Sequence, residues 1–260
     1  MSAIPTKTGR ITCAAGLELH WESFGSGPAL LCCNGVGVST FFWKYVVEAF
    51  SDRCQVILWD YRGHGQSDRP SDPLSCDLSI QASSEDLQEV MRAAGAEKAV
   101  LLGHSMGCQV ALETAFKAPE KVAGLVLMQG SAGKVLDTFF DSPNSVRIHR
   151  WLERGVNLVG LRLQPVTRRL LQLPAAWAFT SRLGLVDPYY TKRADFLPYL
   201  EHMADLDPRL FLRMVSEAHE HNLFPHLAQI EHPALVVAAE KDTFTPMWLS
   251  KRIVREMPNA

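Results

Sequence analysis

Short apolar runs alternate with amphipathic segments through the first half of the chain. The apolar runs lie at residues 29–33, 56–59, 99–102 and 122–128. Each is bounded by glycine, proline or polar residues, which is typical of strands buried on both faces of a parallel sheet. Helical spacing is found between or after these runs, at residues 41–50, 84–93 and 108–117. Strands joined by helices predict a parallel sheet with right-handed crossovers.

Two further strands are predicted near the N-terminus, at residues 10–14 and 17–24, and we expect them to pair antiparallel. The Gly-Ser-Gly-Pro sequence at residues 25–28 ends the second of them. The predicted fold class is therefore α/β, with a doubly wound, mostly parallel sheet.

The alternation stops in the second half of the chain and then resumes. Residues 134–226 are rich in Leu, Arg, Trp and Pro, and their pattern is helical without a clear strand. A strand at 234–239 and a helix at 245–257 follow. We therefore predict an α/β core at 1–133 and 227–260, interrupted by a helical lid at 134–226. Ligands of open α/β sheets bind at the carboxyl ends of the strands, so a lid there would cover the site.

One tight junction between a predicted strand and a predicted helix carries a hydroxyl group. The run at 99–102 leads into Gly-His-Ser-Met-Gly at 103–107, and a helix follows at once. A serine in such a turn is forced toward positive φ, which costs on the order of 1–3 kcal/mol. The strain lifts Oγ of Ser105 clear of the sheet, and the helix start offers free N–H groups to an anion. We interpret this as a Gly-x-Ser-x-Gly nucleophile elbow rather than an ordinary loop.

With this junction in place, the chain resembles the α/β-hydrolase superfamily, in its lid-bearing serine esterase and lactonase branch. A second resemblance is Asp-Tyr-Arg-Gly-His-Gly-Gln-Ser at residues 60–67, which is similar to a turn of that family. The resemblance implies a structural, glycine-rich corner held by Asp and Arg contacts. His64 lies at the edge of the sheet formed by the carboxyl ends of the strands, where ligands bind, but we interpret it as a turn residue rather than a catalytic one.

A third resemblance is Asn-Gly-Val-Gly at residues 34–37, where family members often have His-Gly-x-Gly. The resemblance implies an oxyanion hole formed by the backbone N–H groups of Val36 and Met106. These donors belong to the backbone, so the Asn in place of His matters little. The alternative is an Asn-Gly hairpin turn, which fits less well because a helical pattern, not a strand, follows Gly37.

The resemblance also implies a catalytic acid and a histidine. Asp242 follows the strand at 234–239 and matches the family's acid, although a turn or helix N-cap aspartate is the alternative. Asp137 is the fallback acid. The family's order is Ser, Asp, His, yet the last histidine, His232, precedes Asp242. We expect the catalytic histidine beyond residue 260, because His232 should lie at the wrong edge of the sheet and the other histidines read as surface or packing residues.

These residues predict an enzyme: a serine hydrolase that cleaves a carboxylic ester, lactone or related acyl bond through an acyl-enzyme. Serine at the elbow argues against dehalogenases and epoxide hydrolases, which resemble this architecture but carry Asp there. The alternative is a non-catalytic ligand-binding protein on the same fold, because no histidine follows Asp242. The chemistry requires no metal or organic cofactor. The apolar residues of the lid favour a small, partly apolar acyl substrate.

Composition and charge limit the classes of binding partner that we expect. The formal net charge of −2 gives no reason to propose nucleic acid or an acidic membrane as partner. No unbroken apolar run is long enough for a transmembrane segment, and the N-terminus lacks a signal-like apolar core, so we expect a cytoplasmic protein. The six cysteines form neither Cys-x-x-Cys nor a zinc spacing, so we expect free thiols.

Overall fold

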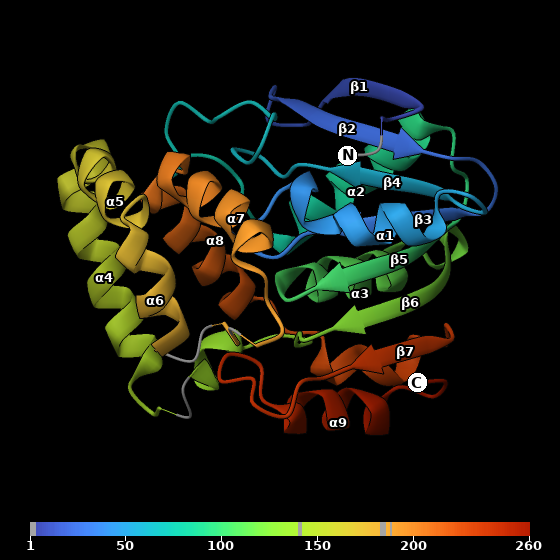
Figure 1. The fold of residues 1–260 in the computed structure, drawn as a ribbon. Coiled ribbons are helices and arrows are strands. Elements are labelled where there is room, and N and C mark those ends of the chain that lie inside the picture. The colour runs from blue at the N-terminus through green and yellow to red at the C-terminus, as the bar shows by residue number, and fades with distance from the viewer. Residues whose placement is uncertain (1–3, 140–141, 183–185, 188) are drawn as a thin grey trace.

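A seven-stranded sheet forms the centre of the computed structural model, which describes residues 4–139, 142–182, 186–187 and 189–260. The strand order is β1-β2-β4-β3-β5-β6-β7, and all pairs are parallel except β1–β2 and β2–β4 (Figure 1). The strands are β1 (Lys7–Thr12), β2 (Glu18–Phe24), β3 (Ala29–Cys33), β4 (Gln55–Trp59), β5 (Ala99–His104), β6 (Val122–Met128) and β7 (Ala234–Val237).

Helices cover both faces of this sheet because its central strands are apolar on both sides. Successive residues of β3, such as Leu30 and Leu31, point to opposite faces of the sheet and belong to two different buried clusters. The smaller cluster lies under η1 (Thr40–Trp43) and α1 (Lys44–Phe50). The larger one packs against three helices on the other side: α2 (Ile80–Ala94), α3 (Met106–Lys117) and α9 (Met247–Glu256). The predicted doubly wound α/β fold is therefore confirmed.

The chain between β6 and β7 is helical, as predicted. Its helices lie beside the sheet, with α4, α5 and α6 farthest from it and α7 and α8 between them and the core (Figure 1). None of the helices among the described residues is long and apolar enough to cross a bilayer. The helices are η3 (Val135–Asp137), α4 (Ser145–Val159), η5 (Gly160–Leu163), α5 (Gln164–Leu171), α6 (Pro174–Arg182), α7 (Arg193–Asp205), α8 (Pro208–Glu220) and η6 (Phe224–Gln229).

Most element boundaries differ from the predicted ones by one to four residues, as three examples illustrate. The helix expected at 41–50 is a short 3-10 turn followed by α1. Strand β5 continues through Gly103 and His104, because both residues still pair with β6. Strand β7 ends at Val237, where its pairing with β6 ends, so the expected last two residues belong to the loop before Asp242.

All six cysteines are free thiols, as expected. Four of them are buried, whereas Cys54 and Cys76 are half-buried. Across the described ranges, no group of three or more His, Cys, Asp or Glu side chains is arranged to hold a metal ion.

Candidate active site

Ser105 sits at the junction of β5 and α3 in a conformation that few residues with a Cβ adopt. Its backbone angles are φ 54° and ψ −119°. The N–H of Ser105 donates to the carbonyl of Met128 on β6 at 3.0 Å, and its own carbonyl accepts from Cys108 in the first turn of α3 at 3.0 Å. Backbone strain of this kind is maintained only when the surroundings fix it, and it is common at active sites. The geometry is the one predicted for a nucleophile elbow.

The glycines around Ser105 are required by close backbone approach. A Cβ on Gly107 would collide with the carbonyl oxygen of Cys33 at the end of β3. A Cβ on Gly103 would lie 2.6 Å from the carbonyl oxygen of Gly107. The strand and the helix can therefore meet at this angle only if both positions lack a side chain.

The loop after β3 lies directly against Ser105. A Cβ on Gly35 would lie 3.3 Å from Cβ of Ser105, which places this loop beside Ser105. Within the part of the chain that the structure describes, neither the N–H of Val36 nor that of Met106 has a hydrogen-bond acceptor. Two unpaired N–H groups next to a serine hydroxyl can bind the negative charge of a tetrahedral intermediate.

Two side chains that the sequence did not assign to the site hold this loop in place. Nε2 of His64 accepts from the N–H of Gly37 at 3.2 Å, while Nδ1 donates to the carbonyl of Arg62 at 3.2 Å. Asn34 is fully buried; its amide donates to the carbonyl of Trp59 at 2.7 Å and its Oδ1 accepts from Nε1 of Trp43 at 2.6 Å. The His64–Gly37 and Asn34–Trp59 contacts join residues 27 and 25 positions apart, so no local sequence pattern predicted them.

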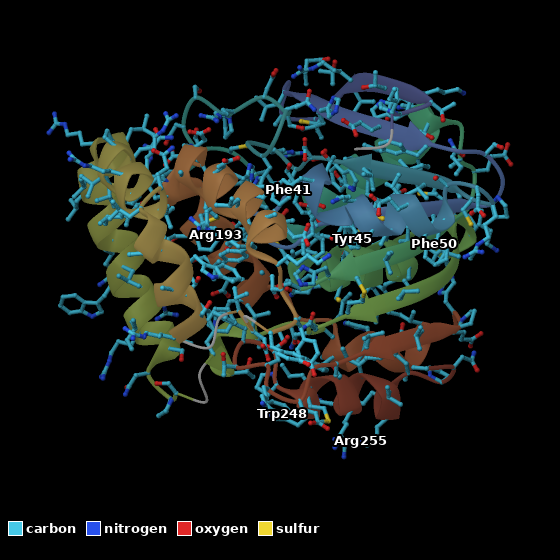
Figure 2. All side chains as sticks on the ribbon, viewed as in Figure 1. Phe41, Tyr45, Phe50, Arg193, Trp248 and Arg255 are labelled. Atoms are coloured by element: carbon cyan, nitrogen blue, oxygen red, sulfur yellow. The ribbon has the colours of Figure 1, made fainter. Side chains whose placement is uncertain are left out.

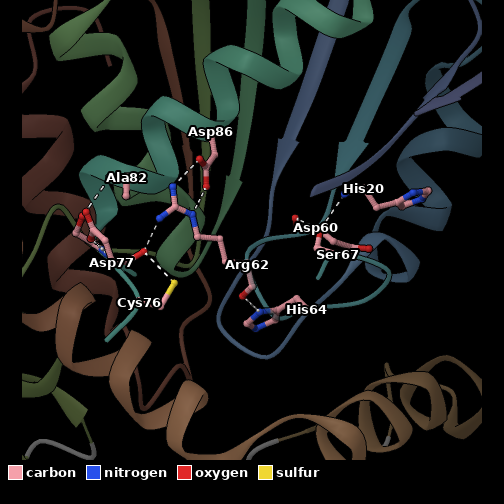
Figure 3. Close-up of polar contacts among 10 residues, drawn as sticks. His20, Asp60, Arg62, His64, Ser67, Cys76, Asp77, Ala82 and Asp86 are labelled. Carbon is pink, nitrogen blue, oxygen red and sulfur yellow. Dashed lines mark hydrogen bonds and ion pairs between the residues drawn. The ribbon is translucent and has the colours of Figure 1, made fainter. Parts of the chain in front are cut away.

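The turn at 60–67 has the structural role that the resemblance implied. Asp60 accepts from the N–H of Thr40 at 3.0 Å and from that of Gln66 at 2.9 Å. Arg62 forms a bidentate pair with Asp86 of α2, with both N–O distances 2.7 Å (Figure 3). Burial raises the pKa of Asp60 to about 6, although the two N–H donors oppose that shift. The turn thus connects the loop at residues 34–37, which we call the oxyanion loop after its predicted role, to the sheet edge and to α2.

Asp242 lies in the loop after β7, where the sequence placed it. Its Oδ1 accepts from the N–H groups of Phe244 and Thr245, both at 2.9 Å, and its Oδ2 accepts from Oγ1 of Thr245 at 2.8 Å. The carboxylate also acts electrostatically on His104, the residue before Ser105. Its role as catalytic acid stays a prediction. The fallback, Asp137, is exposed in η3.

Three of the histidines have contacts that do not involve the hydroxyl of Ser105. His104 is half-buried and stacks on Phe42, with 4.6 Å between the ring centroids, and desolvation lowers its pKa to about 4. His149 bonds to Ser216 inside the helical segment at 2.8 Å. His232 bonds to the carbonyl of Pro119, before β6 begins, and so lies at the edge opposite Ser105 as expected. Over the described ranges, no histidine forms a hydrogen bond with Ser105.

Helices α7 and α8 rest on the oxyanion loop and the residues after it. A Cβ on Gly37 would lie 2.5 Å from Sδ of Met203 on α7. The hydroxyl of Tyr45 donates to Asp195 of α7 at 2.8 Å, and the Phe41 ring lies 5.8 Å from that of His202. Phe41 and Tyr45 are labelled in Figure 2. The helical segment therefore contacts the loop that carries Val36.

Comparisons with known proteins identify the family. The sequence model of the α/β hydrolase fold family matches residues 28–259. A relative from Azorhizobium caulinodans, named putative carbamate hydrolase RutD, is 30% identical; the match covers 94% of this chain and 84% of the relative. A hydrolase from Pseudomonas aeruginosa is similar in structure, with a TM-score of 0.73 and 24% identity over 98% of this chain and 88% of the other. A thermophilic esterase from Thermogutta terrifontis is also similar in structure, with a TM-score of 0.69 and 22% sequence identity. That match covers 97% of this chain and 87% of the esterase.

Proposed function

Because the chain belongs to the α/β hydrolase fold family and is a hydrolytic enzyme, we propose that it cleaves a carboxylic ester, lactone or related acyl bond through an acyl-enzyme on Ser105. The observation that carries this proposal is the strained Ser105 with two unpaired N–H groups beside it. A side chain held at positive φ and aimed away from the sheet has no evident packing purpose. It suits a nucleophile that must reach a carbonyl carbon.

The proposed reaction has two halves. Oγ of Ser105 attacks the carbonyl carbon while a histidine takes its proton, and the N–H groups of Val36 and Met106 bind the resulting oxyanion. The histidine then gives the proton to the leaving alcohol, whose bond to the acyl carbon breaks. Water, deprotonated by the same histidine, attacks the acyl-enzyme and releases the acid. Asp242 would orient that histidine.

The helical segment at 134–226 is proposed to act as the lid of this site. Its helices α7 and α8 contact Gly37 and the residues that follow it, so they bound the space above the oxyanion loop. A site closed by apolar helices would suit a small, partly apolar acyl substrate. A carbamate is the second candidate substrate, because the relatives that match 94% of this chain are named putative carbamate hydrolases.

The test is hydrolysis of p-nitrophenyl acetate by the 260-residue chain and by Ser105→Ala, each with and without added imidazole. No histidine of the described ranges forms a hydrogen bond with Ser105, so added imidazole can supply the base. We expect turnover that imidazole increases and that Ser105→Ala abolishes, with the variant's melting temperature near that of the original protein. Equal turnover by the two proteins after subtraction of the imidazole background would refute the nucleophile.

A second assay separates the substrate classes. Matched p-nitrophenyl ester, lactone and carbamate substrates are compared by kcat/KM under the conditions that give turnover. A preference for the ester or lactone supports the first candidate, and a preference for the carbamate supports the second. Labelling of Ser105 by a fluorophosphonate probe in the presence of imidazole, found by mass spectrometry, would exclude a purely non-catalytic binding protein.

A further inference from the structure

The outer helices of the segment between β6 and β7 carry a strong excess of positive charge. Residues 142–182 contain seven arginines and one acidic residue, Glu153, in a chain whose net charge is −2. Among the described residues, Arg168 is the one of these arginines with an ion-pair partner, Asp205, at 3.5 Å. Over the same described ranges, no ion pair is formed by the other six, which are Arg147, Arg150, Arg154, Arg162, Arg169 and Arg182.

Helix α4 exposes apolar side chains directly beside its arginines. Arg147, Arg150 and Arg154 follow one strip of the helix at a spacing of three and four residues. The neighbouring strip carries Ile148, Trp151, Leu152, Leu158 and Val159, all of them exposed. Trp151 is 72% exposed and Leu158 is 89% exposed, so these side chains project into solvent.

The apolar strip forms an open groove. A groove of about 560 Å³ runs along α4 and η5 and is lined by Ile148, Trp151, Val156, Val159 and Leu163. The same end of the molecule exposes further apolar side chains on η5 and α5, namely Leu161, Val166 and Leu170. In Figure 1 this end lies farthest from the sheet, so it can meet a flat surface without hindrance from the core.

We propose that this face of α4 and η5 docks on an anionic lipid membrane surface. Helices that lie in a membrane interface combine arginine or lysine on one strip with Trp and Leu on the next, as α4 does. The formal charge of +6 over residues 142–182 favours binding to a negatively charged surface. A second copy of the chain is disfavoured, because a symmetric contact through this face would oppose arginines with arginines. The inference does not depend on the chemistry of Ser105.

Vesicle co-sedimentation tests the proposal. The purified chain is mixed with vesicles of phosphatidylcholine alone or of phosphatidylcholine and phosphatidylglycerol in equal parts. We expect binding to the anionic vesicles that falls as salt is added. An arginine near an anionic surface contributes about five-fold to partitioning, so the Arg147→Gln/Arg150→Gln/Arg154→Gln variant should bind about 100-fold more weakly. Trp151→Ser/Leu158→Ser should lose about tenfold.

Matched controls come from α9, which lies away from α4 in Figure 2. Trp248→Ser and Arg255→Gln remove an exposed tryptophan and an exposed arginine there and should leave vesicle binding unchanged. All the substituted side chains are exposed, so melting temperatures should stay close to the original. Absence of binding to anionic vesicles, or equal binding by the α4 variants, would overturn the proposal. So would a dimer in sedimentation velocity that Trp151→Ser/Leu158→Ser dissociates, because a second copy would then occupy this face.

Discussion

Two histidines that contact the loop at residues 34–37, His64 and His104, are kept neutral, and they have different roles. Burial lowers the pKa of His64 to about 3, with His202 adding to that shift, and lowers the pKa of His104 to about 4. His64 uses both ring nitrogens in hydrogen bonds to the backbone. Nδ1 of His104 is buried without a hydrogen-bond partner among the described residues. The first therefore orders the oxyanion loop, and the second makes the fold sensitive to acid.

Replacing His64 by Phe should lower kcat more than it raises KM. The Phe ring cannot accept from the N–H of Gly37, so the loop that carries Val36 loses its anchor. Loss of one oxyanion donor costs about 100-fold to 1,000-fold in kcat, and displacement of the loop should cost a part of that, about tenfold to 100-fold. Imidazole-assisted ester hydrolysis would measure both constants.

The matched control for this change is His232→Phe at the opposite edge of the sheet, where the ring bonds only to the carbonyl of Pro119. It should leave kcat unaltered. If His64→Phe raises KM alone, or lowers kcat no more than His232→Phe, then His64 does not position the oxyanion loop.

Replacing His104 by Leu should reduce the loss of stability in acid. The folded protein keeps His104 neutral down to about pH 4, whereas the unfolded chain takes up a proton near the ordinary pKa of 6.5. Lowering the pH from about 7 to about 5 therefore favours unfolding by roughly 2 kcal/mol through this residue. The stability is present above the unfolded pKa and is lost as the pH falls toward the folded one. Urea unfolding at the two pH values would measure the difference, and an unchanged difference in the variant would contradict the assignment.

Single residues could be assigned from sequence where a local motif fixes them. Ser105 lies between glycines at a strand–helix junction, and that spacing alone indicates a strained turn. No comparable local motif indicated the positioning roles of Asn34 and His64. Their partners, Trp59 and Gly37, lie 25 and 27 positions away in sequence, so only the folded chain shows that they hold the loop beside Ser105.

At the scale of elements, the junction of β5 and α3 depends on one helical glycine. Gly107→Ala places a Cβ against the carbonyl oxygen of Cys33, and backbone on both sides leaves no room to shift. We expect a strongly destabilised or insoluble protein. Gly155 in α4 is the control, because a Cβ there meets nothing within 4 Å. Gly155→Ala should stabilise the protein by about 0.5–1 kcal/mol in thermal or urea unfolding. Similar stabilities for the two variants would show that β3 and α3 do not need this close approach.

The strands were easier to predict than the ends of the elements. Residues 122–128 form β6 at the predicted bounds, because a buried strand needs an unbroken apolar run. Strand β7 is shorter than predicted, since its length is set by pairing with β6 and not by its own apolar residues. The helix expected at 245–257 begins at Met247, immediately after Pro246. Boundaries of this kind follow from tertiary contacts that a sequence pattern does not contain.

At the scale of the whole molecule, the distribution of charge matters more than its sum. A net charge of −2 gave no reason to expect an acidic partner, yet residues 142–182 carry +6 and lie together at one end of the molecule (Figure 1). The remainder of the chain is correspondingly acidic. An average over the sequence hides this separation, whereas the fold keeps α4 and α5 away from the sheet and exposes their arginines.

The ion pair between Arg62 and Asp86 connects the turn after β4 to α2. Removing one partner should show how much an unpaired buried charge lowers the free energy of unfolding. Both side chains are at most 5% exposed. Burial raises the pKa of Asp86, and Arg62 opposes that shift. Arg62→Met leaves the carboxylate without its partner and should cost about 3–5 kcal/mol at neutral pH. Adding Asp86→Leu removes the stranded charge, so the double variant should be more stable than Arg62→Met alone. Urea unfolding of the four proteins completes the cycle, and additive losses would show that the pair does not act as a unit.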